Sequence, residues 1–298
     1  MDLTLNKASR SDSANALVVA IILNYKNYDD TICCVEELLK QDYSRLLCVI
    51  VDNASPNDSI QQLKNTLGTD RRVTILEAPF NGGYAAGNNV GARWASINLQ
   101  PTYILIINPD VRMPEPSSIT RLVAFADLQR DAGAVSPKVI LPNGFVQGPY
   151  ERPDMILSCI QFLIPAVWLV RRNRHQREFR AETKPRRCFR TIGACMLLRA
   201  DSFAQVGMFD EGTFLENEEP ILAELFNKQG KYFYHYPDVT VVHHHTRPGD
   251  GKYTMTSLKY YFKTYRGASD FALSTLEFCS KFYDAVYAPL KRRLPITQ

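Results

Sequence analysis

The apolar and polar positions of residues 16–140 alternate between short apolar runs and longer amphipathic stretches. Residues 17–23 (LVVAIIL) form a continuous β-branched apolar run, which is typical of a strand buried on both faces. Further strands are predicted at residues 46–51, 73–76, 103–107 and 134–140, and helices near residues 29–39, 84–97 and 117–127. Asp29 or Asp30 is expected to cap the first helix. This alternation predicts an α/β fold with a mostly parallel sheet covered by helices.

The second half of the chain is less regular. Residues 155–190 are apolar at first and basic afterwards, and apolar character returns at residues 191–199. Pro220 predicts the first turn of a helix with Glu219 as its N-cap. The remaining predictions are strands at residues 232–236 and 239–243, a helical, aromatic-rich tail at residues 257–289, and a basic end at residues 291–293.

Composition places the chain among ordinary globular proteins, because 45% of its 298 residues are hydrophobic and 22% are charged. The formal net charge of +4 is too small to indicate nucleic-acid binding, so we expect no nucleic-acid partner. Seven cysteines without a CxxC spacing favour reduced thiols over a disulfide framework or a zinc ribbon. Residues 1–15 are polar and contain no apolar signal core. Together these features favour a cytoplasmic protein.

The longest apolar window, residues 155–170, is shorter than the roughly 20 residues that a transmembrane helix needs. A basic run follows it immediately: Arg171, Arg172, Arg174, Arg177 and Arg180. An apolar segment followed by a basic one suits a peripheral contact with an anionic membrane surface. A core helix with a solvated, charged continuation explains the same pattern, and the sequence does not separate the two.

Polar side chains follow four of the predicted strands. They are Asn24 and Tyr25 after the first, Asp52 and Asn53 after the second, Asn81 with Gly82 and Gly83 after the third, and Asn108 and Asp110 after the fourth. Ligands of parallel sheets bind at the carboxyl ends of the strands, so these residues predict a shared site. The glycine-rich residues 81–89 enter a helix and would allow backbone N–H groups to approach a phosphate or a sugar.

Three further features suggest chemistry, each with a plain structural alternative. Asp110, at the end of a buried strand, suits a hard divalent cation beside a diphosphate, although Asn108–Asp110 is also an ordinary turn sequence. Glu218 and Glu219 precede a helix, where a carboxylate suits general-base work or simple capping. His243 ends a predicted strand, and strand geometry places it and His245 on one face as metal or phosphate ligands or as structural histidines.

These segments, in this order, resemble the family 2 glycosyltransferases with the GT-A fold, in the subgroup of bacterial rhamnosyltransferases of surface-polysaccharide assembly. The resemblance covers residues 18–245. It implies a GT-A domain at residues 1–250, with a donor-binding half near residues 16–140 and an acceptor and catalytic half near residues 141–250. A basic, helical extension at residues 251–298 would follow.

The resemblance implies an inverting, metal-dependent transfer of a sugar, with rhamnose as the leading guess. The donor would be a dTDP- or UDP-sugar, and the acceptor a glycan or a lipid-diphosphate-linked saccharide. Glu219, with Glu218 beside it, would take the proton of the acceptor hydroxyl, and Asp110 with His243 would hold Mg²⁺ or Mn²⁺. The implied donor-binding residues are Asn24, Tyr25, Asp52, Asn53, Asn81, Gly82, Gly83, Asn88, Asn108 and Asp110.

Two positions depart from the family pattern. Asn108 replaces the first carboxylate of the metal motif, and Glu219 replaces the usual aspartate of the catalytic pair. Two other classes therefore stay open. A nucleotide-sugar pyrophosphorylase would need a glycine-rich, basic loop after its first strand, where this chain has Asn24–Asn27. A non-catalytic carbohydrate-binding protein that keeps the fold would tolerate both departures.

Overall fold

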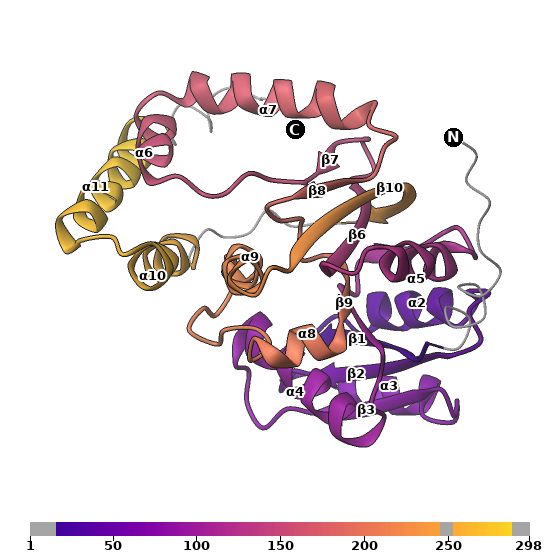
Figure 1. The fold of residues 1–298 in the computed structure, drawn as a ribbon. Helices are drawn as coiled ribbons and strands as arrows, with labels where there is room; N and C mark the ends of the chain where they lie inside the picture. The colour runs from indigo at the N-terminus through magenta and orange to yellow at the C-terminus, as the bar shows by residue number, and fades with distance from the viewer. Residues whose placement is uncertain (1–15, 245–252, 288–298) are drawn as a thin grey trace, which may run out of the picture.

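The computed structural model describes residues 16–244 and 253–287 (Figure 1). The polar N-terminal residues 1–15, His245 and the basic residues 291–293 lie outside the described residues.

The strands are β1 (Val18–Asn24), β2 (Leu46–Asp52), β3 (Val73–Glu77), β4 (Tyr103–Ile107), β5 (Val111–Arg112), β6 (Ala132–Ile140), β7 (Val146–Gln147), β8 (Arg186–Cys188), β9 (Cys195–Arg199) and β10 (Tyr232–His243). The helices are α2 (Tyr28–Leu38), α3 (Ser59–Leu67), α4 (Gly83–Asn98), α5 (Ser118–Leu128), α6 (Met155–Leu163), α7 (Pro165–Arg180), α8 (Ala200–Gln205), α9 (Glu218–Lys228), α10 (Thr254–Arg266) and α11 (Asp270–Val286).

One sheet with the strand order β3-β2-β1-β4-β9-β6-β10-β5 runs through the molecule. The strands β3, β2, β1 and β4 are parallel to one another, and β10 is parallel to β6. Because β9 is antiparallel to both β4 and β6, these two strands point the same way. Six strands therefore end at one edge of the sheet, where β9 begins. The predicted mostly parallel sheet is confirmed.

The two faces of β1 explain why its sequence is apolar throughout. Ala20 and Ile22 belong to the core cluster under α2, α3 and α5, whereas Val19 and Ile21 belong to the cluster under α4, α8 and α9. Successive side chains of a strand point to opposite faces, so a sheet covered on both sides needs no polar positions. All four of these side chains are fully buried.

The C-terminal helices extend the molecule on the side of α9 (Figure 1). Tyr261 and Phe262 of α10 and Leu276 of α11 form a third core cluster with Ile221 of α9. The predicted helical tail is thus confirmed over its described part, as two helices. The apolar-then-basic residues 155–180 form α6 and α7, which are bent by 114° relative to each other. Within residues 16–244 and 253–287, no individual helix meets the length and hydropathy of a membrane span, although the bent pair meets them jointly.

Three local predictions were wrong. The N-cap of α2 is Asn27, and Asp29 and Asp30 lie in its first turn, where they still complement the helix dipole. The predicted strands 232–236 and 239–243 are one strand, β10, because a register shift against β6 accommodates Pro237. The N-cap of α9 is Asn217, so Glu219 lies inside the helix instead of capping it.

Candidate active site

The ends of β1 and β2 hold a buried pair of polar side chains. Nδ2 of Asn24 donates to Oδ2 of Asp52 over 2.7 Å, and Oδ1 of Asn24 accepts from the Thr31 hydroxyl over 2.9 Å. Oδ1 of Asp52 accepts the backbone N–H of Ser55 over 2.9 Å. Asn24 is 0% exposed, so its side chain orients Asp52 and is not accessible to a bound ligand. Tyr25, the next residue, is 42% exposed, and its ring lies 4.9 Å from the Lys26 ammonium group.

Asn53 connects the end of β2 to the glycine-rich segment before α4. Its Nδ2 donates to Oδ1 of Asn81 over 2.9 Å and to the carbonyl of Gly83 over 3.2 Å. Asn81 Oδ1 also accepts the backbone N–H of Gly83 over 3.0 Å. The structure thus brings the predicted residues after the second and third strands together. The side chain of Asn81 connects Asn53 to the backbone of Gly83.

Gly83 has a role that the sequence did not reveal. Its φ of +87° is left-handed, and a Cβ atom there would lie 2.0 Å from the carbonyl oxygen of Phe214. The next amide, that of Tyr84, donates to this same carbonyl over 2.8 Å. Gly83 therefore lets the start of α4 touch the loop before α9. Asn88, which is 1% exposed, donates to the Tyr84 carbonyl over 3.0 Å and so supports this helix from inside.

The turn after β4 carries Asp110 and is held by an arginine. Arg112 donates to the carbonyl of Pro109 over 2.8 Å and forms an ion pair with Asp30 at 2.6 Å. The backbone N–H of Asn108 donates to the carbonyl of Ala194 over 2.9 Å, which attaches the turn to the start of β9. These contacts fix the backbone on both sides of Asp110, whose side chain is 21% exposed.

His243, at the end of β10, faces Asp110. Its Nε2 lies 3.2 Å from Oδ1 of Asp110, and its Nδ1 lies 2.7 Å from Oε1 of Gln147 on β7. An amide oxygen can only accept a hydrogen bond, so Nδ1 is the donor in its contact with Gln147, and Nε2 is the ring nitrogen that faces the carboxylate. His243 is 4% exposed, whereas His244 is exposed, as strand alternation predicts.

The donor atoms of Asp110 and His243 fit a divalent cation. Two ligands at right angles, each about 2.1 Å from one ion, lie about 3 Å apart. The observed 3.2 Å between the carboxylate oxygen and the imidazole nitrogen agrees with this geometry. Within the described ranges, no group of three or more His, Cys, Asp or Glu side chains could hold a metal. Water and phosphate oxygens would therefore supply the other ligands, which is the usual arrangement for Mg²⁺ beside a diphosphate.

Glu218 and Glu219 begin α9 directly after a strained turn. Glu216 and Asn217 both have left-handed φ angles, of 68° and 67°. Non-glycine residues adopt this conformation at a cost of roughly 1–3 kcal/mol each, and such strain collects at functional sites. The two glutamates are 5% and 8% exposed, so the turn places both carboxylates inside the protein.

Gly193 lies close to both carboxylates and connects them to the turn that carries Asp110. Its N–H donates to Oε1 of Glu219 over 2.7 Å, and its carbonyl accepts from the Tyr84 hydroxyl over 2.8 Å. A Cβ atom at Gly193 would lie 3.0 Å from Glu219 Oε1 and 3.3 Å from Glu218 Oε1. The next residue, Ala194, accepts from Asn108. The structure thus brings together the end of β4 and the start of α9, which lie far apart in the sequence.

The electrostatics of this cluster distinguish the two glutamates. Burial and the charge of Glu219 hold the pKa of Glu218 well above its ordinary value. Glu218 Oε2 is buried and has no hydrogen-bond partner within the described residues. Glu219 instead accepts the backbone N–H of Gly193 over 2.7 Å. Burial, followed by the charges of Glu218 and Glu219, also raises the pKa of Tyr84 well above its ordinary value, so its hydroxyl stays a hydrogen-bond donor.

Several residues of the cluster were missed by the sequence analysis. Arg112 and Gln147 act through contacts with residues distant in sequence, and no local motif marks them. The segment that begins with Gly193 resembles the family, but the sequence did not show that Gly193 contacts Glu219. Asn89 is similar: it binds the backbone of Phe209 through both ends of its amide, at 2.8 and 3.1 Å. Only its place in the glycine-rich segment could have drawn attention to it.

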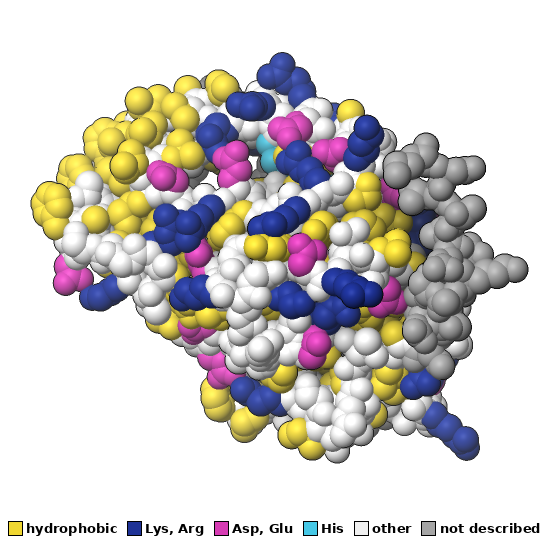
Figure 2. All heavy atoms as spheres, in the orientation of Figure 1, with side chains coloured by type: hydrophobic (Ala, Val, Ile, Leu, Met, Phe, Trp, Pro, Cys, Tyr) yellow, Lys and Arg dark blue, Asp and Glu magenta, His cyan; other side chains and the backbone are white. Residues whose placement is uncertain are grey.

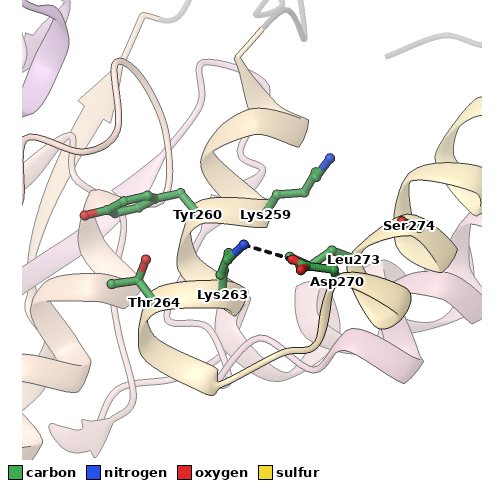
Figure 3. A pocket seen from close by; sticks show the side chains of 7 residues that line it. All are labelled: Lys259, Tyr260, Lys263, Thr264, Asp270, Leu273 and Ser274. Atoms are coloured by element: carbon green, nitrogen blue, oxygen red, sulfur yellow. Dashed lines mark hydrogen bonds and ion pairs between the residues drawn. The ribbon is translucent and has the colours of Figure 1, made fainter.

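A pocket between α10 and α11 does not belong to this cluster (Figure 3). Its lining residues all come from residues 259–274, and the Lys263–Asp270 ion pair of 2.8 Å spans it. None of the strand-end residues lines this pocket.

Comparison with known proteins identifies the family of the chain. Residues 19–207 match the sequence profile described as glycosyl transferase family 2. The N-acetylglucosaminyl-diphospho-decaprenol L-rhamnosyltransferase of Mycobacterium tuberculosis is 27% identical over 216 residues, 66% of this chain and 66% of that protein. A low-salt glycan biosynthesis hexosyltransferase of Haloferax volcanii is 26% identical over 199 residues, 67% of this chain and 58% of that protein. The chain thus spans slightly less than two thirds of the length of these relatives.

Solved structures with the same fold confirm the predicted GT-A class. A mannosyltransferase of Pyrobaculum calidifontis, in complex with GDP-Man and Mn²⁺, aligns with a TM-score of 0.60 at 16% identity, over 94% of this chain and 76% of that one. GalNAc-T7 with UDP, GalNAc and Mn²⁺ aligns with a TM-score of 0.62 at 13% identity, over 94% of this chain and 58% of that one.

Proposed function

The chain belongs to glycosyl transferase family 2, and from this premise we propose that it transfers a sugar from a nucleotide-diphosphate sugar to a glycan or lipid-linked acceptor. The observation that carries the proposal is the convergence of Glu218, Glu219 and the Asp110 turn around Gly193 and Ala194. An acid–base pair beside a cation site is what a sugar transfer needs, because one proton is removed while a diphosphate leaves.

In this proposal the donor lies across the strand ends. Tyr25, which is exposed, and Asp52, which Asn24 orients, would contact the base, and Asn53 and Asn81 would lie beside it. A divalent cation, Mg²⁺ or Mn²⁺, held by Asp110 and His243 would supply positive charge beside the diphosphate.

Glu219 is the general base of the proposed reaction. Its side chain, which also accepts the Gly193 N–H, takes the proton of the acceptor hydroxyl, and that oxygen attacks the anomeric carbon. Attack opposite to the leaving diphosphate inverts the configuration. Glu218 lies beside it, and burial and the charge of Glu219 raise the pKa of Glu218. Carboxyl groups in different environments are a common basis of acid–base catalysis.

The substrates are proposed from the relatives. The mycobacterial relative is named as a rhamnosyltransferase acting on a diphospho-decaprenol-linked sugar. We therefore propose a dTDP- or UDP-sugar, with rhamnose first, as the donor, and a lipid-diphosphate-linked saccharide of surface-polysaccharide synthesis as the acceptor.

A donor panel with Mn²⁺ tests the proposal. We expect one nucleotide sugar to raise the melting temperature and to be hydrolysed slowly or transferred to an acceptor. Glu219→Gln should lower turnover about 100-fold or more while leaving donor binding intact. Glu115→Gln, an exposed glutamate with 54% side-chain exposure, is the matched control and should leave turnover unchanged.

Three results would contradict the proposal. Wild-type turnover by Glu219→Gln would remove the proposed base. Formation of a nucleoside triphosphate from donor and pyrophosphate would indicate a pyrophosphorylase. Donor binding without turnover, for every donor and acceptor tried, would indicate a binding protein.

A further inference from the structure

The outer faces of α6 and α11 expose rows of large apolar side chains. On α6, Ile156, Ile160 and Leu163 follow the i, i+4, i+7 spacing of one helix face and are 73%, 39% and 39% exposed. On α11, Phe271, Phe278 and Phe282 are 83%, 67% and 39% exposed. Single exposed apolar residues are common, but two rows on neighbouring helices indicate an interaction surface.

The two rows belong to one surface. The rings of Phe162 and Tyr283 lie 6.1 Å apart, and the Tyr287 hydroxyl donates to the Leu163 carbonyl over 3.2 Å. These contacts hold α11 against α6. Figure 2 shows the result as hydrophobic side chains gathered at the upper left of the molecule, over the helices α6 and α11 of Figure 1.

The first two turns of α7 expose three consecutive apolar side chains. Trp168, Leu169 and Val170 are 46%, 48% and 65% exposed. Consecutive residues of a helix are turned by about 100°, so these three point in different directions. Trp168 shares its helix face with His175 and Phe179, which pack against each other on the inner side of α7, whereas Val170 lies on the outer side. The exposed rows of α6 and α11 are called the apolar patch below.

Basic side chains border the apolar patch along α7. Val170, Arg174 and Arg177 share one exposed helix face at i, i+4 and i+7, so the apolar end of that face passes directly into a positive one. Within the described parts of the chain, Arg174 and Arg177 form no ion pair. Figure 2 shows Lys and Arg side chains beside the patch, along the top of the molecule.

We propose that the apolar patch and Arg174 and Arg177 form a docking surface for a lipid bilayer with anionic headgroups. The apolar rows would enter the outer acyl region while the arginines reach the phosphate level, which is the arrangement of interfacial helices. An apolar patch alone would fit a second copy of the chain equally well. The arginines beside it favour a bilayer instead, because their positive charge complements anionic headgroups. The inference does not depend on the proposed sugar transfer, since docking needs no substrate.

The docking surface is also tied to the catalytic helix. Arg152, shortly before α6, binds Glu224 of α9 through two hydrogen bonds of 2.8 and 2.6 Å. Tyr261 of α10 donates to the same carboxylate over 2.8 Å. The surface is therefore held in a fixed orientation relative to the helix that begins with Glu218 and Glu219.

Vesicle binding tests the proposal with the full chain and without substrates. We expect co-sedimentation with vesicles of equal parts phosphatidylcholine and phosphatidylglycerol at low salt, and little with phosphatidylcholine alone. The double variant Arg174→Glu, Arg177→Glu should weaken binding about 25-fold or more, since each basic residue near an anionic surface contributes roughly fivefold. Lys64→Glu, Arg71→Glu is the matched control, since it changes the net charge equally at exposed positions around α3, away from α7 (Figure 1).

The apolar contribution has a separate readout. Ile156→Ser, Phe278→Ser should lose vesicle binding at an unchanged melting temperature, because both side chains are solvent-exposed.

Two outcomes would overturn the proposal. One is vesicle binding that is absent, or equal in wild type and in both surface variants. The other is a concentration-dependent dimer that Ile156→Ser, Phe278→Ser converts to a monomer while vesicle binding stays unchanged. The second result would assign the patch to a second copy of the chain.

Discussion

In this structure Nε2 of His243 lies 3.2 Å from Oδ1 of Asp110, although 132 positions separate the two residues in the sequence. The contact forms because β5, the short strand directly after Asp110, is antiparallel to the end of β10, with His243 opposite Val111. The backbone N–H of His244 donates to the Asp110 carbonyl over 2.7 Å and secures the same register. Sheet pairing alone therefore assembles the pair of atoms that suits a divalent cation.

Gln147 should control the cation affinity of this pair. In Gln147→Ala the side-chain oxygen that fixes the orientation of the His243 ring is lost. Loss of a hydrogen bond that orients a metal-binding histidine lowers metal affinity about 10- to 100-fold. Calorimetric titration of Mn²⁺ in the presence of a nucleoside diphosphate measures the effect. Gln176→Ala is the control, because Gln176 binds the backbone of Val146 on the same strand without touching His243. Equal Mn²⁺ affinity in Gln147→Ala and wild type would contradict the role of Gln147.

Glu218 should make the protein less stable as the pH rises. Its folded-state pKa is raised by burial and by Glu219, so the folded state binds a proton that the unfolded state has released. Stability on this account is greatest below the unfolded pKa of about 4.3 and decreases as the pH rises towards the raised folded value. Glu218→Gln removes the titration and should raise the melting temperature at pH 8 more than at pH 5.

Thermal unfolding at both pH values, with Glu115→Gln as control, checks this expectation. An identical change in melting temperature at the two pH values would show that Glu218 does not titrate in this range.

Gly83→Ala should destabilise the protein far more than its backbone conformation explains. A Cβ atom would lie 2.0 Å from the Phe214 carbonyl oxygen, so the loop before α9 must move. Gly230 is the matched control, because its φ of +67° is also left-handed but nothing lies within 4 Å of a Cβ there. We expect a loss of about 1–2 kcal/mol for Gly230→Ala from backbone strain alone, and more than about 3 kcal/mol for Gly83→Ala. Urea unfolding measures both, and equal losses would show that the loop yields without cost.

The Glu224 carboxylate should contribute stability at neutral pH that is lost in acid. Burial alone would raise its pKa, but the hydrogen bonds from Arg152 and Tyr261 and the charges of Arg152 and Arg266 outweigh burial and lower it. Because the pKa of Glu224 is lower in the folded than in the unfolded state, its charged form stabilises the fold at pH values above the unfolded pKa of about 4.3. This stabilisation is lost as the pH falls through the folded-state pKa.

Arg152→Ala should therefore lower the free energy of unfolding by about 3 kcal/mol at pH 7, because it leaves the nearly buried Glu224 carboxylate without its ion-pair partner. The loss should be much smaller at pH 3. Arg121→Ala, which breaks the exposed ion pair with Glu115, should cost less than about 1 kcal/mol at either pH. Urea unfolding at the two pH values gives both comparisons. A cost for Arg152→Ala that does not change with pH would refute the assignment.

Much of the N-terminal half was predictable because its signals are local. The apolar run at residues 17–23 is continuous since β1 is buried on both faces, and the turn residues that follow each strand mark its end. Helix caps were less predictable. Glu219 was expected at the N-cap from Pro220, but two left-handed residues, Glu216 and Asn217, start the helix earlier. A backbone conformation that is unfavourable for its own residues is chosen by the surrounding loop and leaves no mark in the sequence.

By itself the sequence determined the alternation of strands and helices, the residue types at the strand ends and the apolar-then-basic segment, because periodicity and side-chain chemistry are properties of neighbouring residues. The tertiary structure alone decided which of those residues meet. It placed Gly193 close to two carboxylates, set Gln147 behind His243 and turned the outer rows of α6 and α11 to solvent. Such contacts join segments far apart in the chain, and they follow from strand order and helix packing, which no local pattern encodes.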